Sequence, residues 1–266
     1  KYWLFINGNE QFSTFDEEKY HEPLIHPAMS LSGQRKDILV LGGGEGLAVR
    51  EILKYKDVEK VTVVDLDPVM TELAKHNPII TKINQNAMVD LKVEVKNQDA
   101  FTFIENSEEF YDVIFVDLPD PNSVALSRLY SREFYSLCQR RLNKYGIIVT
   151  QASSPVHSPN SFVCIIKTME SADFTVLPYH NNIPTLGEWG WCLGMRKGVV
   201  TNKMLKERVA EIELPPPPTK FLNNDAIVSM VNFGKGVLDK KERVKVNTIL
   251  DPIIVKYYKK GAWDVY

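Results

Sequence analysis

The chain has 266 residues, of which 44% are hydrophobic and 25% are charged, and its formal net charge at pH 7 is −2. This length allows one large domain with appendages or two small domains, and it suffices for a sizeable core. The balanced charge argues against nucleic acid as a partner, because nucleic-acid binding usually goes with a basic face. No apolar run approaches the ~20 residues of a transmembrane helix, and no signal peptide is recognisable.

The three cysteines, Cys138, Cys164 and Cys192, stand far apart without the spacing of metal ligands. We expect buried free thiols and therefore a reducing, cytoplasmic compartment. The five histidines form no metal-ligand motif either, so no metal site is predicted. Because the chain begins at Lys1 rather than at a methionine, we expect it to be a fragment of a longer protein.

The N-terminal residues are predicted to form a β-hairpin that leads into a helix. Two aromatic and β-branched segments, 2–6 and 11–15, flank Asn7-Gly8, which is a strong turn signal. Asp16 is predicted to cap a helix that begins near Glu17.

From residue 35 onward, strand-like and helix-like segments alternate. The predicted strands are 38–41, 61–64, 91–95, 113–116, 146–150, 174–179 and 189–195. The predicted helices are 47–56, 68–75, 131–141 and 161–171. Such alternation implies right-handed crossovers and a mainly parallel sheet, in which the last two strands can pair antiparallel. The predicted fold class is therefore α/β, with a Rossmann-like, methyltransferase-type sheet flanked by helices and a small N-terminal β-hairpin element.

The C-terminal residues differ in character from this alternating region. Pro215–Pro218 form a stiff extended spacer, and a helix over 225–230 follows it. The chain ends in an aromatic stretch that contains Tyr257, Tyr258, Trp263 and Tyr266. We interpret this part as a tail packed on the main domain. The predicted units are 1–34 (hairpin and connecting helix), 35–213 (Rossmann-like domain) and 214–266 (spacer and tail).

Acidic residues follow four predicted parallel strands at or just beyond the point where each strand ends. These residues are Glu45, Asp65, Asp99, Asp117 and Asp120. In an open parallel sheet, ligands bind outside the carboxyl ends of the strands. Crowded carboxylates repel and raise one another's pKa unless a cation neutralises them. The sequence therefore predicts a substrate that carries positive charges.

A glycine-rich loop with Gly42, Gly44 and Gly46 follows the first parallel strand and opens a helix. Glycines permit a tight turn and a close approach of a ligand to the backbone. Asp65, at the end of the next strand, can accept hydrogen bonds from two ribose hydroxyls. The pattern predicts a nucleoside site, and the alternatives are a tight turn that binds nothing and a dinucleotide site. Glu45 within the loop argues against a phosphate.

The acids after the third and fourth strands each allow two interpretations. Asp99 can meet an adenine amino group, or it can simply cap a helix that starts at Ala100. Asp117 and Asp120 stand in a proline-rich segment that holds them in a fixed relation, unless the segment is only a capped turn. The polar segment 122–130 is predicted to form a mobile lid.

In their order along the chain, these motifs resemble those of the polyamine aminopropyltransferases, the spermidine synthase family. The resemblance covers residues 3–195 and is carried by Asn7-Gly-Asn-Glu-Gln11, Tyr20-His21-Glu22, Gly42-Gly-Gly-Glu45-Gly46, Arg50-Glu51, Asp65-Leu-Asp67, Gln98-Asp99-Ala100, Asp117-x-x-Asp120-Pro121, Leu129-Tyr130, Gln151 and Ile183-Pro-Thr185. The Asp-Leu-Pro-Asp-Pro-Asn form of the second acidic motif, with Tyr257-Tyr258 in the tail, is most similar to the bacterial membrane-associated branch.

The resemblance implies transfer of an aminopropyl group from decarboxylated S-adenosylmethionine to a diamine, turning putrescine into spermidine and releasing methylthioadenosine. It makes Asp117 the general base, and this reaction needs no tightly bound cofactor because the donor is a co-substrate. The implied substrate-binding residues are Tyr20, His21, Glu45 and Asp120. The implied donor-binding residues are Gln11, Gly42, Gly44, Asp65, Asp99 and Ala100.

The resemblance also implies a homodimer with polyamine and nucleoside ligands. Members of the membrane-associated branch carry transmembrane helices upstream of the catalytic domain. The full-length protein would then lie at the cytoplasmic face of the cell membrane, with this chain as its soluble catalytic part. Two other functions fit the fold: a methyltransferase that uses ordinary S-adenosylmethionine, and a non-enzymatic polyamine or nucleoside sensor. Glu45 and Asp120 speak against a methyltransferase, which needs no acid facing the amino-acid carboxylate of that donor.

Overall fold

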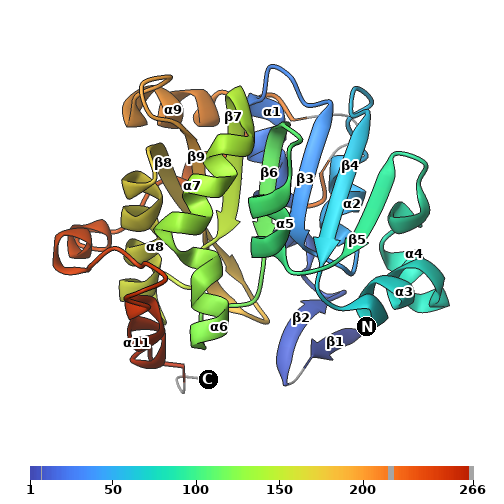
Figure 1. Ribbon diagram of the computed structural model, residues 1–266, viewed down its shortest axis with the longest axis horizontal. Coiled ribbons are helices and arrows are strands. Elements are labelled where there is room, and N and C mark those ends of the chain that lie inside the picture. The colour runs from blue at the N-terminus through green and yellow to red at the C-terminus, as the bar shows by residue number, and fades with distance from the viewer. Residues whose placement is uncertain (7, 215–218, 264–266) are drawn as a thin grey trace.

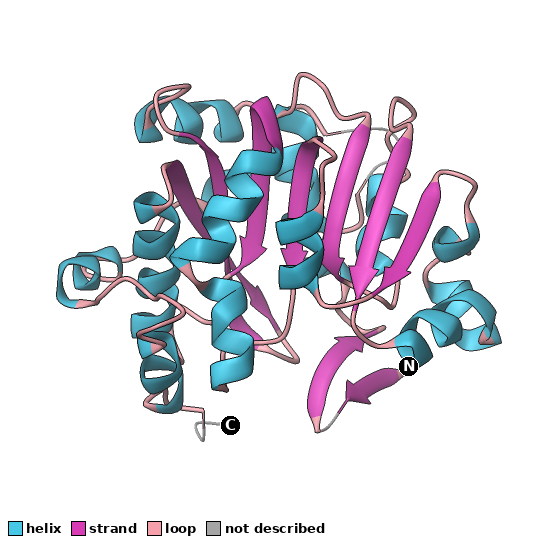
Figure 2. Cartoon of the chain, in the orientation of Figure 1, coloured by secondary structure: helices cyan, strands magenta, loops and turns pink. Residues whose placement is uncertain are grey.

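The computed structural model describes residues 1–6, 8–214 and 219–263. Its centre is a seven-stranded sheet with helices on both faces (Figures 1 and 2). The strands are β1 Trp3–Ile6, β2 Asn9–Ser13, β3 Asp37–Gly42, β4 Lys60–Asp65, β5 Val93–Asn97, β6 Tyr111–Asp117, β7 Leu142–Gln151, β8 Phe174–Ile183 and β9 Gly187–Arg196. The order across the large sheet is β5-β4-β3-β6-β7-β9-β8.

The helices lie between and beyond these strands. The α-helices are α1 Glu18–Leu31, α2 Leu47–Ile52, α3 Pro68–His76, α4 Pro78–Ile83, α5 Ala100–Asn106, α6 Val124–Ser127, α7 Arg132–Arg141, α8 Pro159–Ser171, α9 Asn202–Ala210, α10 Asn224–Met230 and α11 Ile253–Lys259. Short 3-10 helices are η1 Ala87–Val89, η2 Arg128–Tyr130 and η3 Leu238–Arg243.

The sheet is mainly parallel, as the sequence predicts. Strands β3 to β7 run in one direction, and β9 pairs antiparallel with both β7 and β8. The hairpin of β8 and β9 confirms the antiparallel pairing expected of the last two strands. The predicted α/β fold with a small antiparallel N-terminal hairpin is therefore confirmed.

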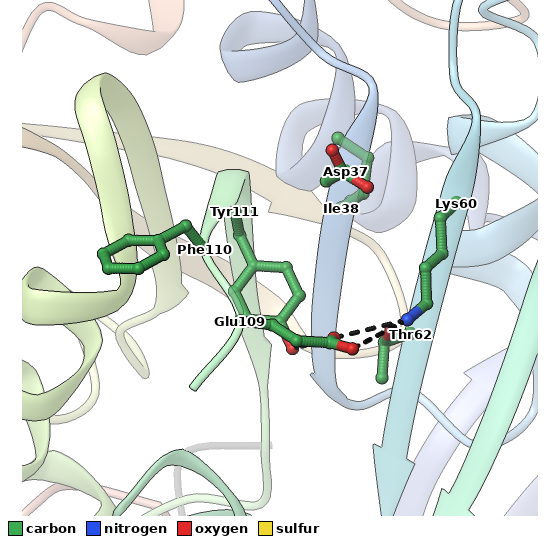
Figure 3. Close-up of a pocket in the computed structure, with 7 residues that line it drawn as sticks. All are labelled: Asp37, Ile38, Lys60, Thr62, Glu109, Phe110 and Tyr111. Carbon is green, nitrogen blue, oxygen red and sulfur yellow. Dashed lines mark hydrogen bonds and ion pairs between the residues drawn. The ribbon is translucent and has the colours of Figure 1, made fainter. Parts of the chain in front are cut away.

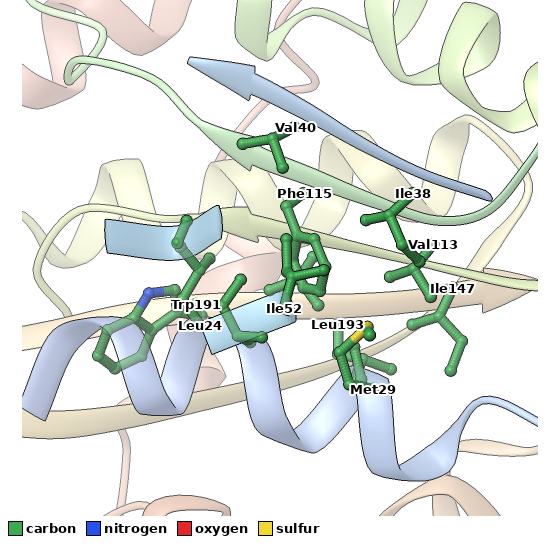
Figure 4. Packing of buried hydrophobic residues seen from close by; sticks show 14 of the residues in the cluster. Leu24, Met29, Ile38, Val40, Ile52, Val113, Phe115, Ile147, Trp191 and Leu193 are labelled. Atoms are coloured by element: carbon green, nitrogen blue, oxygen red, sulfur yellow. The ribbon is translucent and has the colours of Figure 1, made fainter. Parts of the chain in front are cut away.

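Alternation along each central strand produces two hydrophobic cores, one on each face of the sheet. On β3, Ile38 and Val40 pack in the core beneath α1 and α2, whereas Leu39 and Leu41 pack in the core beneath α5, α7 and α8. Successive side chains of a strand point to opposite faces, and a parallel sheet covered on both sides is apolar on both. Figure 4 shows the first core, where Leu24 of α1 lies over the strands.

The caps of the helices test several predictions. Pro68 occupies the first turn of α3, where Asp67 accepts a hydrogen bond from the Val69 N–H. The prediction that Asp16 caps α1 is wrong. Its carboxylate instead accepts hydrogen bonds from the backbone N–H (2.9 Å) and the hydroxyl (3.0 Å) of Thr185, in the turn between β8 and β9. The tertiary contact with Thr185 occupies the Asp16 carboxylate, so Asp16 does not cap α1.

Two predicted boundaries shift for similar reasons. The strand expected over 91–95 is β5, at Val93–Asn97, because pairing with β4 fixes its register and a turn at Asp90 precedes it. The helix expected over 47–56 ends as α2 at Ile52 and continues as turns. Both shifts change the ends of elements and leave their order intact.

Helix α1 packs on one face of the sheet, against β6 to β9, and has two prolines in its interior. A proline has no N–H, so the carbonyl four residues before it loses its helical donor. The carbonyl of Lys19, freed by Pro23, accepts from the Asn181 side chain at 2.9 Å. The carbonyl of Pro23 itself, freed by Pro27, accepts from the Tyr179 hydroxyl at 2.9 Å. The prolines thus create two hydrogen bonds that fix α1 against β8.

The N-terminal hairpin of β1 and β2 forms its own sheet beside the carboxyl ends of the central strands (Figure 1). Gly8 has a positive φ of 81°, which suits the predicted turn. Asn7 of that turn lies outside the described residues.

The tail packs on the main domain through buried polar contacts. The carboxylate of Glu22, buried in α1, accepts the backbone N–H groups of Lys220, Phe221 and Leu222 at 2.6 to 2.9 Å. The helix predicted over 225–230 is α10. The Pro215–Pro218 spacer and Tyr266 lie outside the described residues.

Among the helices in the described part of the chain, none has both the length and the apolarity needed to cross a membrane. Transmembrane helices upstream of this chain, a homodimer and the division into three units stay predictions.

We predict that Glu22→Ala lowers the free energy of unfolding by about 3 kcal/mol, because three backbone donors lose a charged acceptor. Chemical denaturation measures the change. Glu18→Ala, one turn earlier on the same helix, should cost about 0.5 kcal/mol. Equal losses in the two variants would show that Glu22 does not hold the tail.

Candidate active site

The glycine loop lies directly beside the acids at the ends of β4 and β6. A Cβ at Gly42 would lie 1.9 Å from the carbonyl oxygen of Asp117, and one at Gly44 would lie 2.6 Å from Oδ2 of Asp65. Only glycine allows this approach. Asp65 accepts hydrogen bonds from the N–H groups of Gly44 (3.0 Å) and Asp67 (2.8 Å). Burial, and then the charge of Glu45, raise the pKa of Asp65 despite these donors.

Asp117 ends β6 and faces α1. The Tyr20 hydroxyl of α1 donates a hydrogen bond to Oδ1 of Asp117 at 2.6 Å. Removal from water, and then repulsion by Glu45, raise the pKa of Asp117 to about 6, although His21 and Tyr20 act in the opposite sense. A carboxyl group with this pKa can both accept and release a proton near neutral pH.

His21 brings a positive charge into the acidic cluster. Its Nδ1 faces Oε2 of Glu17 at 3.1 Å, and its Nε2 lies 3.6 Å from Oε1 of Glu45. Burial disfavours the imidazolium, but the hydrogen bond to Glu17 and the negative charges of Glu17 and Glu45 outweigh this effect and raise the pKa of His21 to about 10. His21 is therefore a cation at neutral pH.

Donor atoms of His21, Glu45 and Asp117 lie within 4.8 Å of one another. Such a group can hold either a metal ion or an organic cation. A protonated imidazole has no free lone pair for a metal, whereas carboxylates can pair with an organic cation in either state of the imidazole. Oε1 of Glu45 is buried and has no hydrogen-bond partner among the described residues.

Glu17, the partner of His21, belongs to a buried ionic network that the sequence analysis did not predict. The Arg50 guanidinium donates to both oxygens of Glu17 at 2.9 and 2.8 Å, and its Nε donates to Glu51 at 2.9 Å. Glu51 in turn meets Nε2 of His26 at 2.8 Å. Although burial opposes it, the hydrogen bond and charge of His21 and then those of Arg50 lower the pKa of Glu17 to about 2.

Asp120 lies on the same stiff loop as Asp117 but has different partners. Its Oδ1 accepts from Nε2 of Gln151 at 3.1 Å, and its Oδ2 lies 3.5 Å from the Ser153 hydroxyl. Tyr258, from the C-terminal helix, acts with Gln151 and Ser153 to lower the pKa of Asp120, an effect that the sequence did not reveal. Desolvation exceeds the effect of these donors and raises the pKa of Asp120 to about 6.

Asp99 caps α5, so the structural alternative is confirmed for its Oδ1, which accepts from the backbone N–H (2.9 Å) and hydroxyl (3.0 Å) of Thr102. Its Oδ2 forms an ion pair with Arg128. Ala100 begins α5 next to it. The predicted lid over 122–130 is folded into α6 and η2, and Arg128 joins it to Asp99.

The structure thus brings Tyr20, His21, Glu45 and Asp117 into direct contact or close proximity, and it places Asp65 and Gly44 beside them. Gln11 belongs to β2, and the hairpin of β1 and β2 lies beside the same carboxyl ends of the strands (Figure 1).

A separate surface pocket lies at the opposite, amino ends of the strands (Figure 3). It is lined by Asp37, Ile38, Lys60, Thr62, Glu109, Phe110 and Tyr111. Lys60 there donates to Glu109 at 3.0 Å. The positive charge of Lys60 is neutralised by Glu109. The pocket contains none of the predicted site residues.

Comparison with solved structures defines the class of fold. A spermidine synthase from Thermotoga maritima superposes with a TM-score of 0.76 at 22% identity, over 90% of this chain and 79% of that one. A spermidine synthase in complex with the transition-state analogue AdoDATO superposes with a TM-score of 0.80 at 23% identity, over 91% and 81% of the two chains. The chain has the spermidine synthase fold.

Sequence comparison identifies the family. Residues 17–206 match the family model of the spermine/spermidine synthase domain. The polyamine aminopropyltransferase of Oceanobacillus iheyensis is 42% identical over 99% of this chain and 50% of its own length, and that of Leptospira interrogans is 39% identical over 96% and 49%. The chain belongs to the spermine/spermidine synthase family. It spans about half the length of these curated relatives.

The His21–Glu17 pair makes stability depend on pH in a defined window. Because the pKa of His21 rises from 6.5 to about 10, its contribution is full below pH 6.5 and is lost as pH rises through 10. Because the pKa of Glu17 falls from 4.5 to about 2, its contribution is full above pH 4.5 and is lost as pH falls through 2. The pair stabilises the fold most between pH 4.5 and 6.5.

We predict that Glu17→Gln lowers the pKa of His21 well below 10, because the imidazolium loses its nearest carboxylate. NMR titration of the imidazole C–H resonances measures this pKa. His180, whose partner is Glu188, is the internal control and should titrate as in the wild type. An unchanged His21 titration would show that Glu45 alone sustains its charge.

Proposed function

We propose that this chain catalyses aminopropyl transfer from decarboxylated S-adenosylmethionine to a diamine such as putrescine, with Asp117 as general base. The names of the curated relatives support a polyamine substrate. The transition-state analogue bound to the matching spermidine synthase supports a nucleoside donor of this type.

The observation that carries this proposal is the cluster of His21, Glu45 and Asp117. It contains two carboxylates, one of which has a buried oxygen that accepts no hydrogen bond from the described residues. A buried acceptor without a donor costs free energy. A primary ammonium has three N–H donors and a positive charge. It can therefore donate a hydrogen bond to the unpaired oxygen of Glu45 and neutralise the negative charge of the two carboxylates.

We assign the donor to the glycine-loop side of the site. The carboxylate of Asp65 is held by two backbone N–H groups, which leaves it oriented for ribose hydroxyls. The residues proposed to hold the rest of the donor are Gln11, Gly42, Gly44, Glu45, Asp99 and Ala100. Glu45 in particular would face the ammonium of the aminopropyl chain.

We assign the acceptor to the side of Tyr20, His21 and Asp120, with its attacking nitrogen at Asp117. A primary ammonium has a pKa near ~10.4 and cannot attack carbon until it loses a proton. Asp117 accepts that proton, and the Tyr20 hydroxyl fixes the orientation of its carboxylate. The raised pKa of Asp117 suits a base better than an ordinary carboxylate.

The transfer step balances without a further reagent. The nitrogen lone pair forms a bond to the carbon attached to the sulfonium sulfur, and the C–S bond breaks. Its electron pair returns to sulfur, which leaves as the neutral thioether of methylthioadenosine. The positive charge passes to the new secondary ammonium, which remains among the same carboxylates. Holding nitrogen, carbon and sulfur in line contributes much of the rate by proximity.

We predict that Asp117→Asn lowers kcat by about 100-fold or more, because the attacking amine loses its base. The assay incubates the protein with decarboxylated S-adenosylmethionine and a panel of diamines and triamines, and mass spectrometry detects methylthioadenosine and the new polyamine. Asp57→Asn is the control, since Asp57 pairs with Arg35 on the surface.

Each possible result of this assay is informative. One new polyamine, lost in Asp117→Asn alone, establishes the reaction and names the acceptor. Donor binding by calorimetry without turnover in the wild type would contradict the proposal and favour a sensor. Methyl transfer from ordinary S-adenosylmethionine would contradict it in favour of a methyltransferase.

We predict that Glu45→Gln weakens discrimination between the two donors. Ordinary S-adenosylmethionine carries an additional carboxylate, which Glu45 would repel at close range. The KM for the decarboxylated donor should rise about 10-fold, and inhibition by S-adenosylmethionine should become stronger. Steady-state kinetics measures both, with the surface variant Glu59→Gln as control. Undiminished rejection of S-adenosylmethionine would show that another group excludes its carboxylate.

A further inference from the structure

The surface pocket at the amino ends of the strands lies on the face of the sheet that α5 covers, and its volume is about 270 Å³ (Figure 3). Successive side chains of a strand point to opposite faces. Ile38 and Val61 point into the core beneath α1 and α2. Their neighbours along the strands, Asp37, Lys60 and Thr62, therefore point to the other face, and the pairing of β3 with β4 sets Asp37 beside Lys60.

The pocket and the candidate active site lie at opposite ends of the same three strands. Strands β3, β4 and β6 each contribute their first residue to the pocket, and they end at Gly42, Asp65 and Asp117 of the active site. At a rise of ~3.3 Å per residue, the two places are roughly 15 to 20 Å apart. A small molecule in the pocket is therefore a different molecule from one in the active site.

Thr62 brings a buried hydroxyl group to this pocket. Its side chain is fully buried and lines the pocket, yet its Oγ1 has no hydrogen-bond partner among the described residues. A buried polar atom without a partner costs free energy. A hydroxyl oxygen can accept a hydrogen bond, so a ligand that carries an N–H group would remove this cost.

Asp37 gives the pocket a negative charge that its neighbours do not neutralise. No hydrogen bond or ion pair within the described part of the chain engages its carboxylate, whereas Lys60 already pairs with Glu94 (3.2 Å) and Glu109 (3.0 Å). Removal from water, and then repulsion by Asp112, raise the pKa of Asp37, although Lys60 acts in the opposite sense. The pocket thus has an excess of negative charge.

These features select an organic cation. An anion would be repelled by the carboxylates of Asp37 and Glu109. A metal ion needs several ligand atoms close together, and the only such group among the described residues is in the active site. The buried ring of Tyr111, whose hydroxyl donates to Glu109 at 3.1 Å, adds an aromatic wall (Figure 3). An aromatic wall suits the carbon chain of such a cation.

We propose that this pocket binds a protonated primary amine, whose ammonium donates hydrogen bonds to the Asp37 carboxylate and the Thr62 hydroxyl while its carbon chain lies against Tyr111. It is a second amine site, separate from the acidic cluster at the other end of the strands. The proposal goes beyond the aminopropyl transfer proposed above and does not depend on it.

The test is an NMR titration with putrescine as the amine and 1,4-butanediol as a matched probe that lacks its charges. We expect putrescine to shift the resonances of Thr62 and Tyr111 saturably, and the diol to leave them unchanged. Asp37→Asn should weaken this binding about 10-fold, because the ammonium loses a charged acceptor. Asp225→Asn is the control, since Asp225 is exposed in the first turn of α10, and it should bind putrescine as the wild type does.

Thr62→Val separates a hydroxyl that binds a ligand from one that supports the fold. Because the hydroxyl has no partner in the described structure, its removal should not lower the free energy of unfolding of the ligand-free protein. The same change should weaken putrescine binding at the pocket about 5-fold, the effect of one hydrogen bond. Chemical denaturation measures the first quantity, and the NMR titration measures the second.

Three results would overturn the second amine site. Putrescine shifts confined to the cluster of Glu45 and Asp117 would do so while leaving the proposed function intact. Equal shifts of Thr62 with 1,4-butanediol, or equal putrescine affinity in Asp37→Asn, would show that charge has no part in the binding. Unchanged putrescine affinity in Thr62→Val, together with a loss of stability, would show that the hydroxyl serves the fold instead.

Discussion

The arrangement of the site depends on one electrostatic constraint: carboxylates gathered at one edge of a parallel sheet must share a limited supply of positive charge. The fold places Glu45 and Asp117 close together, and their repulsion would be costly without a counter-charge. His21 supplies it, and Glu17 with Arg50 keeps His21 charged. The remaining negative charge is what a cationic substrate would neutralise.

Helix α1 connects the acidic cluster to the rest of the molecule. In three consecutive residues it presents Tyr20 to Asp117, His21 to Glu45, and Glu22 to the backbone of the tail. Its two internal prolines free carbonyls that accept hydrogen bonds from β8. The same residues that would disrupt an isolated helix therefore join this one to the sheet.

The two acids after β6 illustrate how neighbouring carboxylates acquire separate roles. Desolvation raises the pKa of both to about 6, but Asp117 faces charged groups whereas Asp120 is surrounded by neutral donors. A carboxylate beside a cation and another acid is suited to proton transfer, and one held by neutral donors is suited to binding. The neutral donors Gln151 and Ser153 come from the end of β7 and from the loop that follows it.

The sequence by itself determined the alternation of strands and helices, the glycine turn and the acids at strand ends, because these depend on local periodicity and on residue type. It also carried the motifs that identify the family. Only the tertiary structure decided that Asp16 binds Thr185 instead of capping α1 and that Arg50 fixes Glu17. These contacts join residues that lie 169 and 33 positions apart in the sequence. The packing of helices and strands against one another determines which of these side chains meet. No local sequence pattern specifies these pairs.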